Sequence, residues 1–246
     1  MSVGEPVVVV EGVVKSYNDR VAVNGVSFRV YSGEIFGLIG PNGAGKTTTL
    51  RMIATLIKPD RGRIIVYGVD VVKEPVRARK YIGYLPEDAE VYPRLTGYEH
   101  LLFYARIRSP GNVDETVEYG AKLSGLGDRL YDRAGEYSKG MKRRLLLAIA
   151  LMTKPKLAIL DEPTSGLDVY ASVHVRRMIK EYVRETGSAV IISSHNMLEV
   201  EYLCDRVAFI NKGVIIAEGS PKELIEKYNV SNLEEAFVEA VETSKP

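Results

Sequence analysis

The first thirty residues carry short runs of β-branched apolar residues that are separated by turn-forming ones. Valine-rich runs at residues 7–10, 13–14 and 26–30 are interrupted by Gly12, by a polar segment and by Gly25. Short runs of this kind, bounded by glycine and polar residues, are typical of strands joined by tight turns. The pattern predicts a small, mainly antiparallel sheet at this end of the chain.

A strand, a glycine-rich loop and a helix are predicted next. Residues 35–39 form a continuous apolar run that ends at Gly40, and from residue 46 onward apolar side chains recur at helical spacing. Further apolar runs lie at 157–160, 189–193, 207–210 and 214–217, and a helical pattern covers 171–185. This alternation favours an α/β fold with a mostly parallel sheet covered by helices.

The middle of the chain has a different character. Helical patterns cover residues 99–108, 114–124 and 139–152, and glycine or proline separates them. We therefore expect a single domain over 1–222, with a helical subdomain at about 88–155 inserted in the α/β core. Residues 223–246 are expected to form a short, acidic, helical tail.

Composition and charge restrict the classes of partner. The 246 residues include 33 Lys and Arg against 32 Asp and Glu, so no positive surplus indicates a nucleic-acid partner. The longest apolar stretches are shorter than the ~18 residues that span a bilayer, and no signal segment is evident. Cys204 is the single cysteine and is expected to be a buried structural thiol in a reducing compartment. We expect a cytoplasmic chain that reaches a membrane through a partner.

The segment from Gly40 to Thr47 fits the pattern G-x-x-x-x-G-K-[ST], after a buried strand and at the start of a helix. Backbone N–H groups of such a loop, with the helix N-terminus, surround a β-phosphate. Lys46 would reach the β- and γ-phosphates, and the Thr47 hydroxyl would ligate Mg²⁺. The expected nucleotide-binding residues are Pro41, Asn42, Gly43, Ala44, Gly45, Lys46, Thr47 and Thr48. The motif alone leaves kinases, GTPases and ATPases open.

Two acids and a histidine follow buried strands. Asp161 and Glu162 end the run 157–160, and His195 lies just past the run 189–193. Ligands of open α/β sheets bind at the carboxyl ends of strands, so the three side chains are expected on one rim. Asp161 is the predicted Mg²⁺ partner of Thr47, through a water. Glu162 would polarise the attacking water, and His195 would hold it against the γ-phosphate.

Other charged or titratable positions are expected to be solvent-facing. His100 and His174 have no comparable setting, and we interpret both as exposed. The basic run at residues 142–144 is interpreted as a solvated helix face.

The order of these motifs resembles the ATP-binding subunit of ABC transporters over nearly the whole chain. The segment Leu160-Asp-Glu-Pro163, the segment Ser165-Gly-Leu-Asp168 and the pair Ser194-His195 match motifs of that family. The resemblance implies a P-loop NTPase fold with a RecA-like, mostly parallel sheet, and ATP and Mg²⁺ as cofactors. It also implies that Tyr17 stacks on adenine and that Asp168 belongs to a loop near the nucleotide.

The family's LSGGQ signature corresponds here to residues 137–141, which read Tyr-Ser-Lys-Gly-Met. The resemblance implies that Ser138 and Gly140 contact the ATP of a second copy, so that two chains form a homodimer around two ATP molecules. Lys139 replaces a glycine and Met141 a glutamine. We weigh two positions for Lys139, near that γ-phosphate or in solvent.

A further departure is Glu87, at a position where the family usually has a glutamine that senses Mg²⁺ and the attacking water. A carboxylate there can ligate Mg²⁺ but donates no hydrogen bond when ionised. The sequence resembles the branch of ABC-2 type exporters. Aromatic residues at 84, 92, 98, 103 and 104 lie where the family has a groove for a helix of the membrane permease, although core packing explains them equally well.

The leading hypothesis is therefore an ATPase subunit that powers a separate transmembrane permease, on the inner face of the membrane, with export as the direction. The alternative is a soluble ABC ATPase acting on nucleic acid, ribosomes or an assembly scaffold, which the single cassette and the near-neutral charge disfavour. A GTPase is disfavoured because the segment 211–214 lacks the acid of a guanine-binding Asn-Lys-x-Asp motif.

Overall fold

The N-terminal part of the chain, residues 8–70, contributes an antiparallel sheet. The structure, a computed structural model, describes residues 4–244. Its 4-stranded sheet has the order β2-β1-β4-β5, and every neighbouring pair is antiparallel. Its strands are β1 (Val8–Tyr17), β2 (Arg20–Val30), β4 (Arg61–Val66) and β5 (Val69–Asp70). The antiparallel N-terminal sheet is confirmed, although β1 continues through Gly12, which has a φ of 57° and lies at a register shift.

The second sheet is mostly parallel and carries the strand order β10-β9-β3-β8-β7-β6. Only β9 and β10 pair antiparallel. Its strands are β3 (Ile35–Ile39), β6 (Ile82–Leu85), β7 (Leu157–Asp161), β8 (Ala189–Ser194), β9 (Arg206–Asn211) and β10 (Val214–Gly219). Because β3, β7 and β8 are neighbours and parallel, the loops after them open on the same rim.

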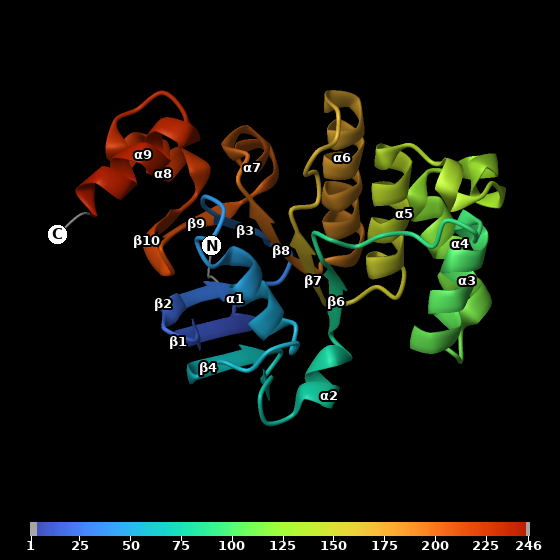
Figure 1. The fold of residues 1–246 in the computed structure, drawn as a ribbon, viewed down its shortest axis with the longest axis horizontal. Coiled ribbons are helices and arrows are strands. Elements are labelled where there is room, and N and C mark those ends of the chain that lie inside the picture. Colours follow the sequence, from blue (N-terminus) through green and yellow to red (C-terminus); the bar gives the residue numbers. More distant parts are fainter. Residues whose placement is uncertain (1–3, 245–246) are drawn as a thin grey trace.

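Helices cover both sheets, and three of them form a separate layer at one end of the molecule (Figure 1). These three, α3, α4 and α5, lie between β6 and β7 in the sequence. The helices are α1 (Lys46–Ile53), α2 (Pro75–Arg79), α3 (Gly97–Arg108), α4 (Val113–Ser124), α5 (Lys139–Leu151), α6 (Val169–Thr186), α7 (Met197–Leu203), α8 (Pro221–Tyr228) and α9 (Leu233–Thr243), with 3₁₀ turns η1 (Gly127–Tyr131) and η2 (Ala134–Glu136).

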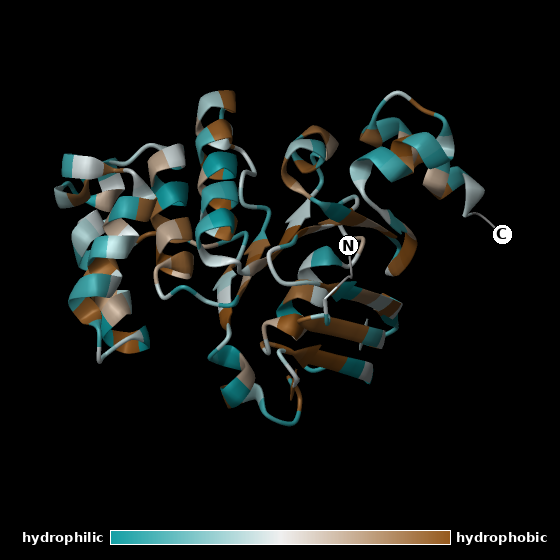
Figure 2. Cartoon of the chain, turned by 180° about the vertical axis from the view of Figure 1, so that it is seen from behind, coloured by the Kyte–Doolittle hydropathy of each residue, from teal (hydrophilic) through white to brown (hydrophobic). Residues whose placement is uncertain are grey.

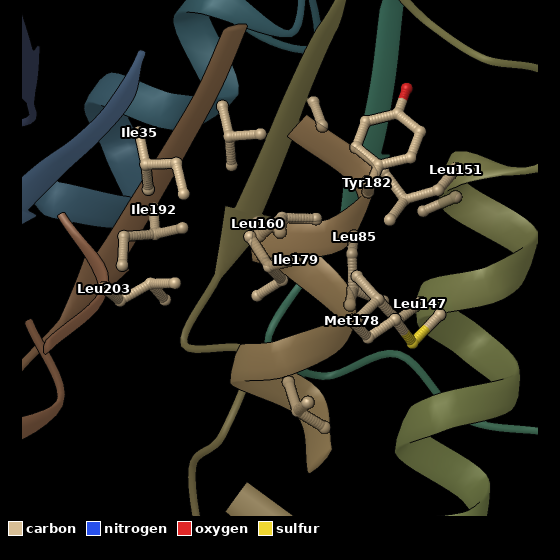
Figure 3. Close-up of a cluster of buried hydrophobic side chains, with 14 of the residues drawn as sticks. Ile35, Leu85, Leu147, Leu151, Leu160, Met178, Ile179, Tyr182, Ile192 and Leu203 are labelled. Atoms are coloured by element: carbon tan, nitrogen blue, oxygen red, sulfur yellow. The ribbon is translucent and has the colours of Figure 1, made fainter. Parts of the chain in front are cut away.

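The six-stranded sheet separates two hydrophobic clusters, as the alternation of side chains along β3 shows. Ile35 and Ile39 belong to the cluster beneath α5 and α6, whereas Phe36 and Leu38 belong to the cluster shared with the antiparallel sheet and α1. In Figure 3, Leu160 of β7 lies close to Ile179 of α6, and Met178 of α6 lies close to Leu147 of α5. Both faces of the central strands are therefore buried, as continuous apolar runs predict.

The distribution of hydropathy agrees with this layering. In Figure 2 the strands of the antiparallel sheet are mostly hydrophobic, whereas the helices alternate between hydrophobic and hydrophilic residues along their length. None of the helices within residues 4–244 combines the length and hydropathy that crossing a membrane requires.

The two C-terminal helices pack on the main cluster. Leu233, Ala236 and Ala240 of α9 are buried, and Phe237 meets Phe209 of β9 edge-on, with ring centroids 5.3 Å apart. Apolar burial of this kind holds α9 against the end of the sheet.

Two of the expectations about single side chains have a clear outcome. Cys204 is buried, as expected, and burial raises the pKa of its thiol. The expectation for His100 is wrong, because this side chain is buried: its Nδ1–H donates to the Thr96 carbonyl at 2.7 Å, and its Nε2 accepts from the Tyr92 N–H at 2.8 Å. His174 is half-buried against Tyr170.

Candidate functional site

The loop between β3 and α1 is held in shape by glycines that allow close backbone contacts. Gly45 caps α1 in a left-handed conformation, with a φ of 106°. A Cβ at Gly40 would lie 2.1 Å from the Ile210 carbonyl oxygen, so only glycine fits there. Lys46 is buried, and its Nζ donates to the carbonyls of Gly40 at 2.7 Å and Pro41 at 3.3 Å. The ammonium group is thus held inside the loop that the sequence predicts to bind phosphates.

At the end of β7, Asp161 lies within reach of the first turn of α1. Its Oδ1 accepts hydrogen bonds from the hydroxyls of Thr47 at 3.2 Å and Ser193 at 2.5 Å. Its Oδ2 is buried and has no hydrogen-bond partner within the described part of the chain. Burial raises the pKa of Asp161, and the hydrogen bonds from Ser193 and Thr47 oppose that shift.

These two oxygen ligands fit Mg²⁺. A buried carboxylate oxygen without a partner, next to a threonine hydroxyl, supplies the hard donors that this ion prefers. Among residues 4–244 no three His, Cys, Asp or Glu side chains gather into a metal site. Mg²⁺ bound here would therefore take most of its ligands from water and phosphate oxygens, as it commonly does. Glu87, the third predicted ligand, lines the adjacent cavity.

Glu162 contacts both of the basic residues predicted to act with it. One carboxylate oxygen lies 3.4 Å from the Lys46 Nζ, and the other lies 2.9 Å from the Nδ1 of His195. Glu162 is buried, whereas His195 is half exposed on its far side. The structure therefore brings together the loop lysine, the acid that directly follows β7 and the histidine after β8, which lie far apart in the sequence.

A cavity of about 560 Å³ runs along the outer side of the loop. Tyr17 lies at the edge of this cavity, and Glu87 and Glu162 line it together with residues 41–48. Sequence reasoning missed Arg20, which also lines the cavity and whose guanidinium lies beside Gly43. No motif marks Arg20; its position follows only from the hairpin that places it next to the loop.

Ser138, Gly140 and Asp168 do not line this cavity. Ser138 caps α5, because its Oγ accepts from the Met141 N–H at 3.2 Å. Asp168 caps α6, accepting from the Ala171 N–H at 2.8 Å. A Cβ at Gly140 would lie 2.7 Å from the Ala171 Cβ, so the two helix starts are in close contact.

Lys139 is exposed, and its Nζ lies over Gly166, which is in the loop that leads to α6. The side chain therefore lies along the surface of its own chain, at the start of α5.

Arg143 corrects the interpretation of residues 142–144 as a solvated helix face. Its side chain is buried, and its guanidinium donates to main-chain carbonyls at the ends of β6 and β7. Helical spacing could have predicted the burial of Arg143, because Arg143 shares a face of α5 with the buried residues Gly140 and Leu147. Its two neighbours are half-buried: Lys142 makes no ion pair within the described residues, and Arg144 donates to the Gly125 carbonyl.

A glycine loop between a buried strand and a helix, with an acid pair at the end of another parallel strand of the same sheet and an inserted helical layer, defines an ABC-type P-loop ATPase. The family model described as "ABC transporter" matches residues 23–165. The chain belongs to this family and is an ATP-binding subunit that hydrolyses ATP. The prediction of the family and of the fold is confirmed.

Two relatives with names that describe their function illustrate the similarity. The linearmycin resistance ATP-binding protein LnrL of Bacillus subtilis (strain 168) is 40% identical over 241 residues, which cover 94% of this chain and 77% of the relative. The Nod factor export ATP-binding protein I of Rhizobium sp. (strain N33) is 43% identical over 222 residues, covering 88% and 72% of the two chains.

Solved structures agree with the assignment. The structure of an ATP binding subunit of an ABC transporter superposes with a TM-score of 0.84 at 29% identity, over 96% of this chain and 99% of the other. The ADP conformation of an ATP-binding cassette of an ABC transporter gives a TM-score of 0.82 at 27% identity, again over 96% and 99%.

Proposed function

We propose that this chain is the ATPase subunit of a membrane exporter, in which two copies enclose two ATP molecules and power a separate permease. The observation that carries the proposal is the contact of Glu162 with Lys46 and His195 beside the phosphate loop. A water that attacks the terminal phosphate must be oriented and must lose a proton, and a carboxylate at this position supplies both functions. Binding alone would not need that acid.

Each side chain has a role that its position suits. Lys46 would bind the β- and γ-phosphates from inside the loop, and the Thr47 hydroxyl and the Asp161 carboxylate would hold Mg²⁺. The ion, when bound, neutralises charge on the phosphate oxygens. Glu162 polarises the water, and His195 hydrogen-bonds to the γ-phosphate from the exposed side. Tyr17 stacks on adenine at the far end of the cavity, while Glu87 borders the cavity near the water.

The start of α5 serves the second copy. Ser138 and Gly140 lie outside the cavity of their own chain, and an exposed helix N-terminus offers free N–H groups and a positive dipole end. In a head-to-tail pair these groups face the γ-phosphate bound by the partner. Asp168 lies on the same surface, where it shapes the loop that enters the pair.

The partner surface for the permease is proposed on the helical layer. Tyr92, Tyr98 and Phe103 are 52%, 37% and 46% exposed. A groove of about 450 Å³ is lined by residues 87–91, by Pro93 and by residues of α5, and Tyr92 lies between two of the lining residues in the sequence. Exposed aromatic side chains beside a groove suit a short amphipathic helix. The name of one relative, the Nod factor export ATP-binding protein I, supports export as the direction. The chain would then lie on the inner face of the membrane through this contact.

Replacing Glu162 by glutamine tests the proposal, with Glu118→Gln on the exposed face of α4 as the matched control. We expect Glu162→Gln to lower ATP hydrolysis by about 100-fold or more while ATP binding is retained. Light scattering at millimolar ATP should show a stable dimer for this variant only. A Glu162→Gln chain that stays monomeric, or that hydrolyses ATP like the control, would contradict the proposal.

A further inference from the structure

Arg143 is buried at the junction of three segments, and main-chain carbonyls occupy all of its donors. Its Nε donates to Pro163 at 2.8 Å, and its Nη2 donates to Asp161 at 2.9 Å and to Glu162 at 2.6 Å. Its Nη1 donates to the carbonyls of residues 86 and 87 at 3.3 and 3.4 Å. A guanidinium has five N–H groups, so this set of hydrogen bonds is complete.

No carboxylate pairs with this cation among the described residues. Burial lowers the pKa of Arg143, and the nearby carboxylates of Asp161, Glu87 and Glu162 oppose that shift. A buried charge must be compensated, and here carbonyl dipoles do so directly. The cation therefore organises the main chain around it instead of neutralising one acid.

The peptide backbone of Glu162 is held from both sides. Its φ of 48° is left-handed, a conformation that is unfavourable for a residue with a Cβ. Its N–H donates to the Ser193 Oγ at 2.9 Å, and its carbonyl accepts from Arg143 and from the Ser165 N–H at 3.1 Å. Such a conformation persists only where the surroundings fix it. Removing Arg143 would release one of the three hydrogen bonds that hold this peptide group and aim the Glu162 side chain at the phosphate loop.

We propose that Arg143 is a positioning residue for ATP hydrolysis. It fixes the backbone of Glu162 in the conformation that presents the carboxylate, and it ties the backbone of Glu87, at the end of β6, to the same point. Arg143 does not line the cavity along the phosphate loop, so its effect is on the rate of the chemical step and not on nucleotide affinity. The inference rests on the proposed role of Glu162.

The conservative variant Arg143→Lys separates this role from charge alone. A lysine keeps the cation but has no planar fork with which to reach carbonyls on the two segments 86–87 and 161–163. Arg144→Lys is the matched control, because that neighbour makes one hydrogen bond to the Gly125 carbonyl at the surface. We expect Arg143→Lys to lower kcat by about 10- to 100-fold, because small displacements of a catalytic group have effects of this size. KM for ATP and the ATP-induced rise in Tm should change less than twofold.

The second readout is a double-mutant cycle with Glu162→Gln, measured as single-turnover ATP hydrolysis. If Arg143 acts through Glu162, adding Arg143→Lys to Glu162→Gln lowers the residual rate little further. Equal kcat for Arg143→Lys and the control, or a full additive loss in the double variant, would overturn the inference. Wild-type hydrolysis by Glu162→Gln alone would instead overturn the proposed function, so the two failures are distinguishable.

Discussion

Replacing Gly45 by alanine perturbs the phosphate loop at the point where α1 begins. The φ of this residue is 106°, a region that residues with a Cβ rarely adopt. The added Cβ would lie 2.5 Å from the Ala22 carbonyl oxygen, which belongs to the backbone of β2 and cannot move aside as a flexible side chain would. Either the loop or the strand must shift by several tenths of an ångström.

Two contributions determine how much unfolding free energy the Gly45→Ala variant loses. The left-handed backbone costs about 1–2 kcal/mol once a Cβ is present, and overpacking against a fixed neighbour costs about 1–3 kcal/mol. The variant should therefore lose about 2–5 kcal/mol of unfolding free energy, which at this chain length lowers Tm by roughly 5–15 °C. The loop N–H groups move with the shift, so nucleotide affinity should fall as well.

Thermal unfolding with and without MgATP measures both effects. Gly68→Ala is the control, because Gly68 has a φ of 75° but no atom within 4 Å of the added Cβ, and it lies in the turn between β4 and β5. The control should lose only about 1–2 kcal/mol of unfolding free energy. It should keep the full stabilisation by ATP, which is about 2.7 kcal/mol when the ATP concentration is 100 times Kd. Equal Tm values for the two variants, with the same shift by ATP, would refute the reasoning.

Two further predictions concern single tyrosines. Burial raises the pKa of Tyr182 to about 12, so its contribution to stability is complete below pH 10, the unfolded pKa, and is lost as the pH rises through 12. Tyr182→Phe should lose about 1 kcal/mol at neutral pH, since Ser188 still donates to the Pro155 carbonyl. Between pH 10 and 12 the unfolding free energy of the variant should fall less steeply than that of the wild type, and the two slopes should differ by about 1.4 kcal/mol per pH unit. Parallel pH profiles of the unfolding free energy, measured by denaturant titration, would contradict this prediction. Tyr17→Ala should weaken ATP binding by roughly 1–3 kcal/mol through lost stacking, and an unchanged Kd in calorimetry would remove Tyr17 from the site.

The spacing of apolar residues predicted those strands and helices whose residues are buried in a regular pattern along the chain. The strand over residues 35–39, the loop after it and the helix α5, predicted over 139–152, were all recognisable from apolar spacing. The acids after β7 were placed correctly relative to the sheet, because parallel strands end on a common rim. The chemical roles of these acids stay predictions.

The spacing of residues could not predict the burial or the partners of side chains that are surrounded by segments distant in the sequence. His100 is buried because the backbone at Tyr92 folds over it, and no spacing rule encodes that contact. Arg143 was grouped with the basic residues on either side of it, although the helical period separates it from them. Arg20 enters the site only through the hairpin between β1 and β2.

The buried thiol of Cys204 makes the unmodified chain a reporter of its own opening. Cys204 follows α7, and its Sγ would lie 2.9 Å from a Cβ added to Gly37 in β3, the strand that leads into the phosphate loop. A buried thiol with a raised pKa reacts with an alkylating reagent only after α7 separates from β3. As the chain has one cysteine, the alkylation rate reports the exposure of this single position. Its dependence on ATP concentration would show whether nucleotide binding stabilises the strand beneath the site.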